Sequence, residues 1–282
     1  MKALIDADIL RYEIGFGGQL KGKDGGVDPL PFDYVADKFD RKIEEILEYT
    51  WGDEPILYLT VDKQTARIAK IEYKENFRVG EAKTKPYKGN RKDCVKPFHY
   101  ENLTLHILSM YNCKLAIGYE ADDLISIHHN EFNRDGIKSV ICTRDKDLRM
   151  TEGYHFGWAC GKQDAFGPKF INRIGYLELD KGKLKGGGLK FFFSQLLTGD
   201  STDNIGGIYK FGPVKAFKLL SELNTEKELF NAVYNEYVKT YGMLALDLLI
   251  EQINLLYICN EYNEDGTLKL YDYKQFLEVD NA

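Results

Sequence analysis

Residues 3–10 read ALIDADIL, a short apolar run of strand character that ends in acidic residues. The same pattern returns in PILYLTVD at residues 55–62 and in KSVICTRDKD at residues 138–147. Segments with helical spacing of apolar residues separate these runs, at residues 34–49 and 103–111. Strands that alternate with helices predict an α/β fold with a mainly parallel sheet.

Each of the three strand-like runs ends at an aspartate: Asp6, Asp62 and Asp145. Ligands of parallel sheets gather at the carboxyl ends of the strands. We therefore expect these carboxylates to face one crevice.

The composition changes after residues 182–190, GKLKGGGLK, whose glycines and lysines predict a loop. Beyond it, FFFSQLL, PVKAFKLLSEL, KELFNAVYNEYVKTY and LALDLLIEQINLLYICNEY all have helical character. We therefore expect an α/β domain over residues 1–188 and a helical module over residues 189–282.

Composition excludes several classes of protein. The chain has 282 residues, 44% of them hydrophobic, and a balance of hydrophobic and charged residues that is ordinary for a folded soluble domain. It contains no apolar run long enough to cross a bilayer and starts without a signal peptide, which predicts a cytoplasmic protein with no membrane partner. Its five cysteines are scattered without a CxxC pair, which predicts reduced thiols.

The net charge of −6 argues at first against a nucleic-acid partner. The distribution is uneven, however, because residues 63–96 contain 11 basic and 4 acidic residues. Such a run is usually a solvated face, but here Tyr73, Phe77 and Tyr87 are interleaved with it, and aromatic rings can stack on bases.

Acidic residues recur in pairs. In a strand, Asp6 and Asp8 share a face, whereas Asp200 and Asp203 have helical i, i+3 spacing. Further pairs occur in GYEADDLI and TRDKDL. Any single aspartate caps helices or favours turns, but so many carboxylates without cations repel one another. Oxygen ligands suit Mg²⁺ or Mn²⁺, and two such ions can drive phosphodiester hydrolysis.

In order along the chain, the motifs IDAD, TVD, PYKGNRK, GYEADDLI, CTRDKDL and LTGDSTDNIGGIYKFGPVKA resemble the flap endonuclease type of 5′ nucleases, particularly the phage 5′ to 3′ exonucleases. The resemblance covers nearly the whole chain. It implies a Rossmann-like (PIN-like) α/β domain followed by a helix-three-turn-helix, or helix-hairpin-helix, module that grips duplex backbone. It also implies a monomeric exonuclease that acts on duplex DNA from 5′ ends, nicks or flaps, and on RNA primers paired with DNA.

The resemblance implies two or more Mg²⁺ ions, replaceable by Mn²⁺, and assigns most acidic residues to the metal site. The implied ligands are Asp6, Asp62, Glu120, Asp122, Asp123, Asp145, Asp147, Asp200 and Asp203. Lys88 and Arg91 would engage the scissile phosphate, and Tyr87 would stack on a base. For Asp8 two roles remain possible: it supports a metal ligand, or it caps a helix.

Contacts to the DNA backbone are expected elsewhere. They are assigned to Arg11, Lys92, Gly207, Lys210, Gly212, Lys215 and Lys218. Lys210 stands where the family's hairpin has its first turn glycine. The sequence therefore allows two possibilities at the hairpin: a direct contact between Lys210 and a phosphate, or a bound K⁺ ion. The segment from Arg91 to Leu103 is too short for a tall helical arch, which favours action at duplex ends over flap threading.

Three alternatives fit less of the sequence. A haloacid dehalogenase-like phosphatase would use Asp6 as a nucleophile, but the second motif is one residue short and YKGNRK has no role in it. A PIN-type ribonuclease lacks the helical module. A non-catalytic protein that binds DNA structures would have lost carboxylates, yet all are present.

Overall fold

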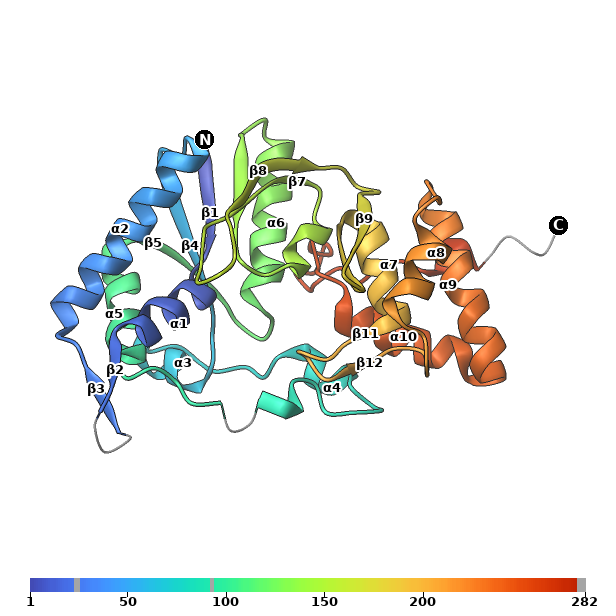
Figure 1. The fold of residues 1–282 in the computed structure, drawn as a ribbon, viewed down its shortest axis with the longest axis horizontal. Helices are drawn as coiled ribbons and strands as arrows, with labels where there is room; N and C mark the ends of the chain where they lie inside the picture. Colours follow the sequence, from blue (N-terminus) through green and yellow to red (C-terminus); the bar gives the residue numbers. More distant parts are fainter. Residues whose placement is uncertain (23–25, 92–93, 278–282) are drawn as a thin grey trace. The chain divides into compact units, whose positions relative to one another are not determined.

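The computed structural model describes residues 1–22, 26–91 and 94–277 (Figure 1). The chain forms two compact units, each discontinuous in sequence. Unit 1 consists of Met1–Asn76, Cys94–Asp145 and Gly153–Phe170, and unit 2 consists of Phe77–Asp93, Lys146–Glu152 and Ile171–Ala282. This division differs from the single boundary at residue 188 that we expected, because the chain passes between the units several times. Periodicity along one chain does not reveal such returns.

Unit 1 is built on a six-stranded sheet in the order β5-β4-β1-β6-β7-β8. Neighbouring pairs from β5 to β7 are parallel, which confirms the predicted mainly parallel sheet. The strands span β1 Lys2–Asp6, β4 Glu54–Thr60, β5 Asn112–Ala116, β6 Ser139–Cys142, β7 Gly153–Gly157 and β8 Phe166–Ile171. A separate hairpin pairs β2 Gln19–Lys21 with β3 Val27–Pro29.

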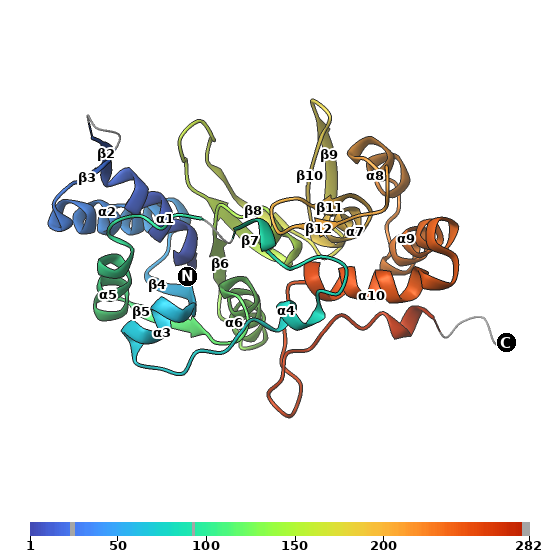
Figure 2. The same cartoon turned by 90° about the horizontal axis from the view of Figure 1, so that it is seen from below.

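Helices cover both faces of this sheet, with α1, α2 and α5 on one side and α6 on the other (Figure 1 and Figure 2). Side chains along a strand alternate between faces, so that Ala3 and Ile5 pack with Phe39 of α2 and Leu103 of α5. The helices of unit 1 span α1 Ala7–Gly17, α2 Phe32–Thr50, α3 Lys63–Ala69, α5 Tyr100–Met110 and α6 Ala121–Arg134. The predicted helices at residues 34–49 and 103–111 are thus confirmed as α2 and α5.

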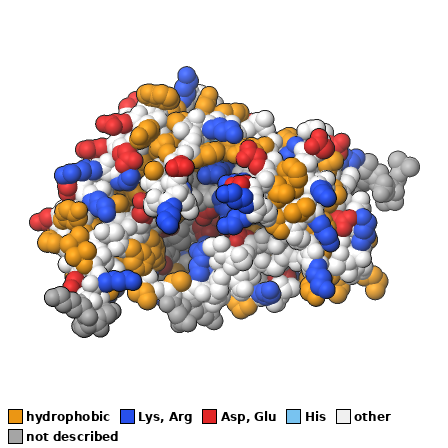
Figure 3. All heavy atoms as spheres, in the orientation of Figure 1, with side chains coloured by type: hydrophobic (Ala, Val, Ile, Leu, Met, Phe, Trp, Pro, Cys, Tyr) orange, Lys and Arg blue, Asp and Glu red, His pale blue; other side chains and the backbone are white. Residues whose placement is uncertain are grey.

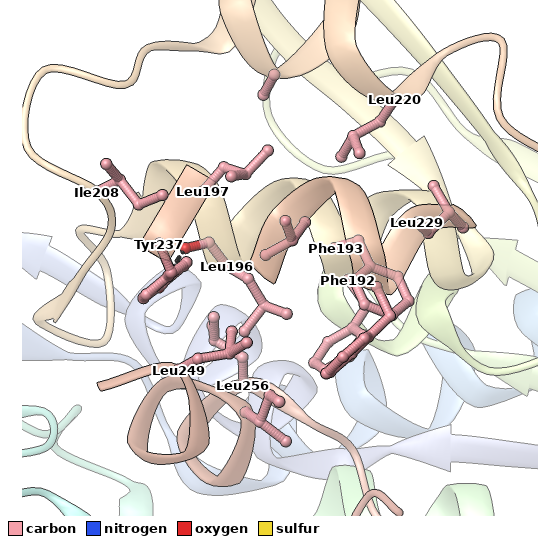
Figure 4. Close-up of a cluster of buried hydrophobic side chains, with 14 of the residues drawn as sticks. Phe192, Phe193, Leu196, Leu197, Ile208, Leu220, Leu229, Tyr237, Leu249 and Leu256 are labelled. Carbon is pink, nitrogen blue, oxygen red and sulfur yellow. Dashed lines mark hydrogen bonds between the residues drawn. The ribbon is translucent and has the colours of Figure 1, made fainter. Parts of the chain in front are cut away.

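Unit 2 surrounds helix α7 (Gly188–Thr198), which is buried along almost its whole length. Figure 4 shows Phe192, Phe193, Leu196 and Leu197 of α7 among apolar side chains from later helices. The Tyr237 hydroxyl donates to the backbone oxygen of Leu196 at 2.7 Å, which satisfies a polar group inside this cluster. The core explains why FFFSQLL is mostly apolar, and its two polar residues, Ser194 and Gln195, are buried with the rest.

The other elements of unit 2 are short strands and helices. The helices span α4 Phe77–Glu81, α8 Pro213–Leu220, α9 Glu226–Tyr241 and α10 Ala245–Leu256, with 3-10 turns η1 Gly89–Arg91, η2 Asp147–Met150, η3 Gly242–Leu244 and η4 Lys274–Phe276. The strands span β9 Tyr176–Asp180, β10 Lys183–Gly187, β11 Gly199–Asp200 and β12 Ile205–Gly206. Within the described ranges, no helix is both long and apolar enough to span a membrane.

The glycine-rich stretch at residues 182–190 is not the loop that we predicted. It forms strand β10, paired with β9, and the first turn of α7. Its glycines permit close backbone packing: a Cβ on Gly186 would lie 2.5 Å from the oxygen of Tyr176, and one on Gly188 would lie 2.6 Å from the backbone of Gly175. Glycine composition alone does not distinguish a loop from such a close approach.

The core of unit 2 gives a test of stability. Leu196→Ala removes a fully buried side chain and leaves a cavity, so that the free energy of unfolding should fall by about 3 kcal/mol. Met243→Ala, at a fully exposed position, is the control and should change it by less than about 0.5 kcal/mol. Urea denaturation measures both. Equal effects of the two substitutions would contradict the central position of α7.

Candidate functional site

Asp6 lies at the carboxyl end of β1 and is the N-cap of α1. Its Oδ1 accepts hydrogen bonds from the backbone nitrogens of Asp8 and Ile9, and its Oδ2 accepts one from the Thr143 hydroxyl at 2.8 Å. The side chain is buried. Burial, with the negative charges of Asp8 and Asp145, raises the pKa of Asp6 to about 7.

Thr143 connects the ends of two neighbouring strands. It follows β6 and donates to Asp6, while its Oγ1 accepts a hydrogen bond from the backbone nitrogen of Asp145 at 2.9 Å. Asp6 and Asp145 are therefore brought together at the carboxyl ends of β1 and β6, as the strand pattern predicted. Sequence reasoning missed Thr143, although its position between β6 and an expected ligand was a usable signal.

Asp8 does not share a strand face with Asp6, because β1 ends at Asp6 and Asp8 belongs to the first turn of α1. Its two oxygens contact the Arg11 guanidinium at 2.7 Å and the backbone nitrogen of Thr60 at 2.9 Å. The expectation based on strand spacing is thus wrong. Asp8 ties α1 to the end of β4, while Asp6 is the helix cap.

Arg11 was expected to contact DNA, and the structure contradicts this. Its side chain is only 2% exposed. Its guanidinium donates to the hydroxyls of Thr65 and Thr104, pairs with Asp8, and lies 4.0 Å from the ring centroid of Tyr100. A buried cation held by these partners stabilises unit 1 and cannot reach a phosphate. The α-helical periodicity places Arg11 on the inner face of α1, which the sequence analysis did not weigh.

Asp62 follows β4 and caps α3. It accepts hydrogen bonds from the Thr65 backbone nitrogen at 2.7 Å and the Tyr100 hydroxyl at 2.8 Å, and it forms an ion pair with Lys96. Burial alone would raise the pKa of Asp62, but these donors and the Lys96 charge lower it to about 2. Asp62 is therefore an ionised carboxylate whose charge is already balanced within unit 1.

The acidic residues of GYEADDLI lie at the start of α6, as predicted. Glu120 is the N-cap and forms a capping box with Asp123, whose Oδ2 accepts from the Glu120 backbone nitrogen at 3.2 Å. The backbone nitrogen of Ala121 donates to Thr60 Oγ1 at 2.9 Å, which fixes this helix start beside the end of β4. Asp123 is fully buried, whereas Asp122 is partly exposed.

In unit 2, Asp147 and Asp200 share a cation. The Lys146 ammonium lies 3.0 Å from Asp147 Oδ1 and 2.9 Å from Asp200 Oδ2. The Gln195 amide also donates to both carboxylates. Burial raises the pKa of Asp200, but the charge and hydrogen bond of Lys146 and the hydrogen bond from the Thr202 backbone nitrogen together lower it. The sequence analysis named both aspartates but missed Lys146 and Gln195.

Asp203 is contacted by Lys88 and Arg91, which were predicted to engage the phosphate, and by Tyr87, which was predicted to stack on a base. Arg91 Nη2 lies 2.5 Å from Asp203 Oδ1, and Lys88 Nζ and the Tyr87 hydroxyl lie 3.7 and 3.3 Å from Oδ2. The predicted helical spacing of Asp200 and Asp203 is wrong, because Asp200 ends β11 and Asp203 lies in the turn before β12. The turn brings this carboxylate to the cations.

The backbone of Lys88 has a positive φ of 52°, which is unfavourable for a residue other than glycine. A hydrogen bond from its nitrogen to the Asp203 oxygen at 2.9 Å supports this conformation. Strained backbone held by its surroundings is typical of functional sites. The Tyr87 ring, in contrast, packs against the core of unit 2, so that only part of it is exposed for stacking on a base.

The hairpin between β12 and α8, together with α8 itself, contains most of the remaining predicted DNA contacts. Lys210 has a φ of 57°, the left-handed conformation for which a glycine is suited, and its side chain is exposed. A Cβ on Gly207 would lie 2.4 Å from the Leu197 oxygen, which explains the glycine. Gly212 is the N-cap of α8, and Lys215 and Lys218 are exposed on that helix. Lys92 lies outside the described residues.

The basic segment at residues 63–96 is not a continuous free surface. Lys96 and Arg67 pair with Asp62 and Glu101 in unit 1, and Arg78 is buried in unit 2 against the backbone oxygens of Leu255 and Tyr257. On the face seen in Figure 3, Lys and Arg side chains are interspersed with carboxylates and hydrophobic side chains. Part of the local positive charge is therefore consumed by internal ion pairs.

Among the described residues, no group of three or more His, Cys, Asp or Glu side chains is arranged to hold a metal ion. The carboxylates occur as pairs instead, Asp6 with Asp145 and Asp147 with Asp200. The second pair already surrounds a cation, the Lys146 ammonium, through hard oxygen ligands of the kind that Mg²⁺ and Mn²⁺ prefer. The donor set therefore fits a divalent ion.

No family model matches the chain. It is 27% identical over 194 residues to DNA polymerase I of Caldicellulosiruptor bescii, and 28% identical over 145 residues to the 5′-3′ exonuclease of Mycoplasma genitalium. The matches cover 67% and 45% of this chain, but only 21% and 47% of those relatives.

Two solved structures are similar over most of the chain. The bacteriophage T5 D15 flap endonuclease, in a complex with DNA and metal ions, has a TM-score of 0.58 and 14% identity, covering 90% of this chain and 88% of that one. The chain shares its fold. T5 5′-exonuclease with bound divalent metal ions (zinc) has a TM-score of 0.53 and 14% identity, covering 92% and 99%. These matches confirm the predicted resemblance to 5′ nucleases.

The raised pKa of Asp6 predicts a pH dependence. The Asp6 carboxyl group releases its proton near pH 7 in the folded chain but near pH 3.8 in the unfolded chain. The contribution of Asp6 to the free energy of unfolding of the wild type should therefore fall as the pH rises from 3.8 to 7. Asp6→Asn cannot ionise, so that with EDTA present its stability relative to the wild type should rise by on the order of 3 kcal/mol from pH 4 to pH 7. Denaturant unfolding across this range measures the difference. Parallel curves for the two proteins would show that Asp6 ionises normally.

Proposed function

We propose that the chain is a metal-dependent 5′ nuclease that hydrolyses phosphodiester bonds of duplex DNA from 5′ ends. The observation that carries the proposal is the Asp6–Thr143–Asp145 arrangement at the carboxyl ends of β1 and β6, in a fold shared with a flap endonuclease. Burial and the charges of Asp8 and Asp145 raise the pKa of Asp6, and carboxyl groups with such shifted pKa values cluster at functional sites. The motif order along the chain agrees with it.

The proposed metal ligands occur in both units. Unit 1 contributes Asp6, Asp62, Glu120, Asp122, Asp123 and Asp145, and unit 2 contributes Asp147, Asp200 and Asp203. Divalent ions bound there, Mg²⁺ or in its place Mn²⁺, would activate a water molecule and stabilise the leaving oxygen. The chemistry then requires no protein nucleophile.

The chain's own cations would orient the phosphate. Lys88 and Arg91 are held together on Asp203, and the hydrogen bond from the Lys88 nitrogen to the Asp203 oxygen supports the left-handed backbone of Lys88. When a phosphate approaches, these two cations can exchange a carboxylate partner for a phosphate oxygen and stabilise charge in the transition state. In the proposal Lys210, Lys215 and Lys218, all exposed, hold the duplex backbone.

The left-handed conformation of Lys210 supports the hairpin that the resemblance implies, and its exposed ammonium can contact a phosphate directly. In the proposal this contact replaces K⁺ at the hairpin. Preferred substrates are duplex ends and nicks, with 5′ flaps and RNA primers on DNA as further candidates, and the enzyme acts as a monomer in the cytoplasm.

The phosphatase alternative is disfavoured because it gives no role to Lys88 and Arg91, which are held together on Asp203. The PIN-type ribonuclease would leave the helices of unit 2 without a role.

The first test is cleavage of 5′-labelled duplex with Mg²⁺, in a panel of blunt, nicked, 5′-flapped, RNA-primed and single-stranded substrates. Asp145→Ala should lower the cleavage rate by about a thousandfold, because it removes a carboxylate from the metal site, while DNA binding remains measurable. Asp37→Ala, at an exposed aspartate of α2, should cleave like the wild type. Absence of short products from the wild type with both Mg²⁺ and Mn²⁺ would refute the nuclease.

A second test separates chemistry from binding. Lys88→Met should slow single-turnover cleavage by about a hundredfold while changing the Kd for DNA much less, because its charge acts mainly in the transition state. Lys74→Met, at an exposed lysine of the same basic segment, is the matched control and should leave the rate unchanged. Equal losses of rate and affinity in Lys88→Met would mean that Lys88 only docks the DNA.

A further inference from the structure

Lys146 occupies an unusual position between two acidic residues of unit 2. Its ammonium lies 3.0 Å from Asp147 Oδ1 and 2.9 Å from Asp200 Oδ2. Asp200 is buried and its other oxygen accepts a hydrogen bond from the Thr202 backbone nitrogen at 2.7 Å. One carboxylate oxygen from each aspartate is thus directed at a single positive charge.

Gln195, which is buried, contacts the same two carboxylates as Lys146. Its Nε2 donates to Asp147 Oδ1 at 2.7 Å and to Asp200 Oδ2 at 3.3 Å, the same two oxygens that Lys146 contacts. The Gln195 side chain is only 4% exposed, and its buried Oε1 has no hydrogen-bond partner among the described residues. Gln195 therefore holds the same two carboxylate oxygens as the Lys146 ammonium, but through a neutral amide that is buried.

The Lys146 side chain is half-exposed to solvent and is held in place mainly by contacts of its ammonium group. Its side chain is 48% exposed, and its ammonium also lies 5.5 Å from the ring centroid of Phe191. The flexible stem can therefore move the charge into solvent without disturbing the core. A divalent ion has twice the charge and binds carboxylate oxygens at about 2.1 Å, so that it can displace an ammonium from the same oxygens.

We propose that Lys146 is a tethered cation that holds Asp147 and Asp200 together when no divalent ion is bound and leaves when such an ion binds both carboxylates. This inference rests on the proposed function and deepens it, since it concerns how the metal ligands of unit 2 are kept ready. Lys146 acts here as a positioning residue.

The charges of the groups support this exchange. Without a cation, the two carboxylates would repel each other. The ammonium and a metal ion would compete for the same two carboxylate oxygens, because Lys146 lies against both of them.

The test is Mn²⁺ binding to the full chain without DNA, measured by calorimetry, with thermal unfolding in the presence and absence of Mn²⁺. Lys146→Met removes the competing charge, so that the chain should bind Mn²⁺ on the order of tenfold more tightly. Without metal its Tm should lie below that of the wild type, and saturating Mn²⁺ should close the difference. Lys146→Arg keeps the charge and should restore both wild-type values to within about twofold in Kd.

Lys185→Met is the matched control, because Lys185 is also an exposed lysine of unit 2 that pairs with an aspartate, Asp180, at 2.7 Å. It should leave the Kd for Mn²⁺ unchanged. An unchanged or weaker Mn²⁺ affinity in Lys146→Met would overturn the inference, and wild-type cleavage of DNA alongside that result would leave the nuclease intact. A wild type that neither binds Mn²⁺ nor cleaves DNA would overturn both.

Discussion

Repulsion between carboxylates is the constraint on which the rest of this structure depends. Parallel strands end at one edge of a sheet, so that Asp6 and Asp145 meet there whether or not their charges favour it. Burial, together with the charges of Asp8 and Asp145, raises the pKa of Asp6 to about 7, and Thr143 holds the two strand ends in place. The fold can keep such a group only because the apolar core of unit 1 more than offsets its cost.

The other carboxylates meet the same constraint with cations instead of protons. Lys96 balances Asp62 in unit 1, and within unit 2 Lys146 balances the Asp147 and Asp200 pair while Arg91 and Lys88 balance Asp203. The basic residues are thus used as internal counter-ions, and this use accounts for basic residues that are not free on the surface of an overall negative chain. Ion pairs of this kind can be exchanged for others, since each cation is at least partly exposed.

In a site of the proposed kind, the ligand side chains must keep their positions when neither metal nor DNA is bound. Their counter-ions must also be replaceable when metal or DNA binds. Hydrogen bonds from backbone and hydroxyl groups fix Asp6, Asp62 and Asp200, while flexible lysines supply the charge. The fixed part preserves ligand geometry, and the mobile part can be displaced without unfolding.

The sequence by itself determined the alternation of strands and helices, the aspartates at strand ends and the order of motifs, because these follow from local periodicity and from residue type. Tertiary structure alone decided that Arg11 is buried, that residues 183–187 form a strand, and that Asp203 lies in a turn against Arg91. It also decided that the chain returns several times to unit 2. These features depend on contacts between residues far apart in sequence, and no local pattern encodes which partner a charged side chain will meet.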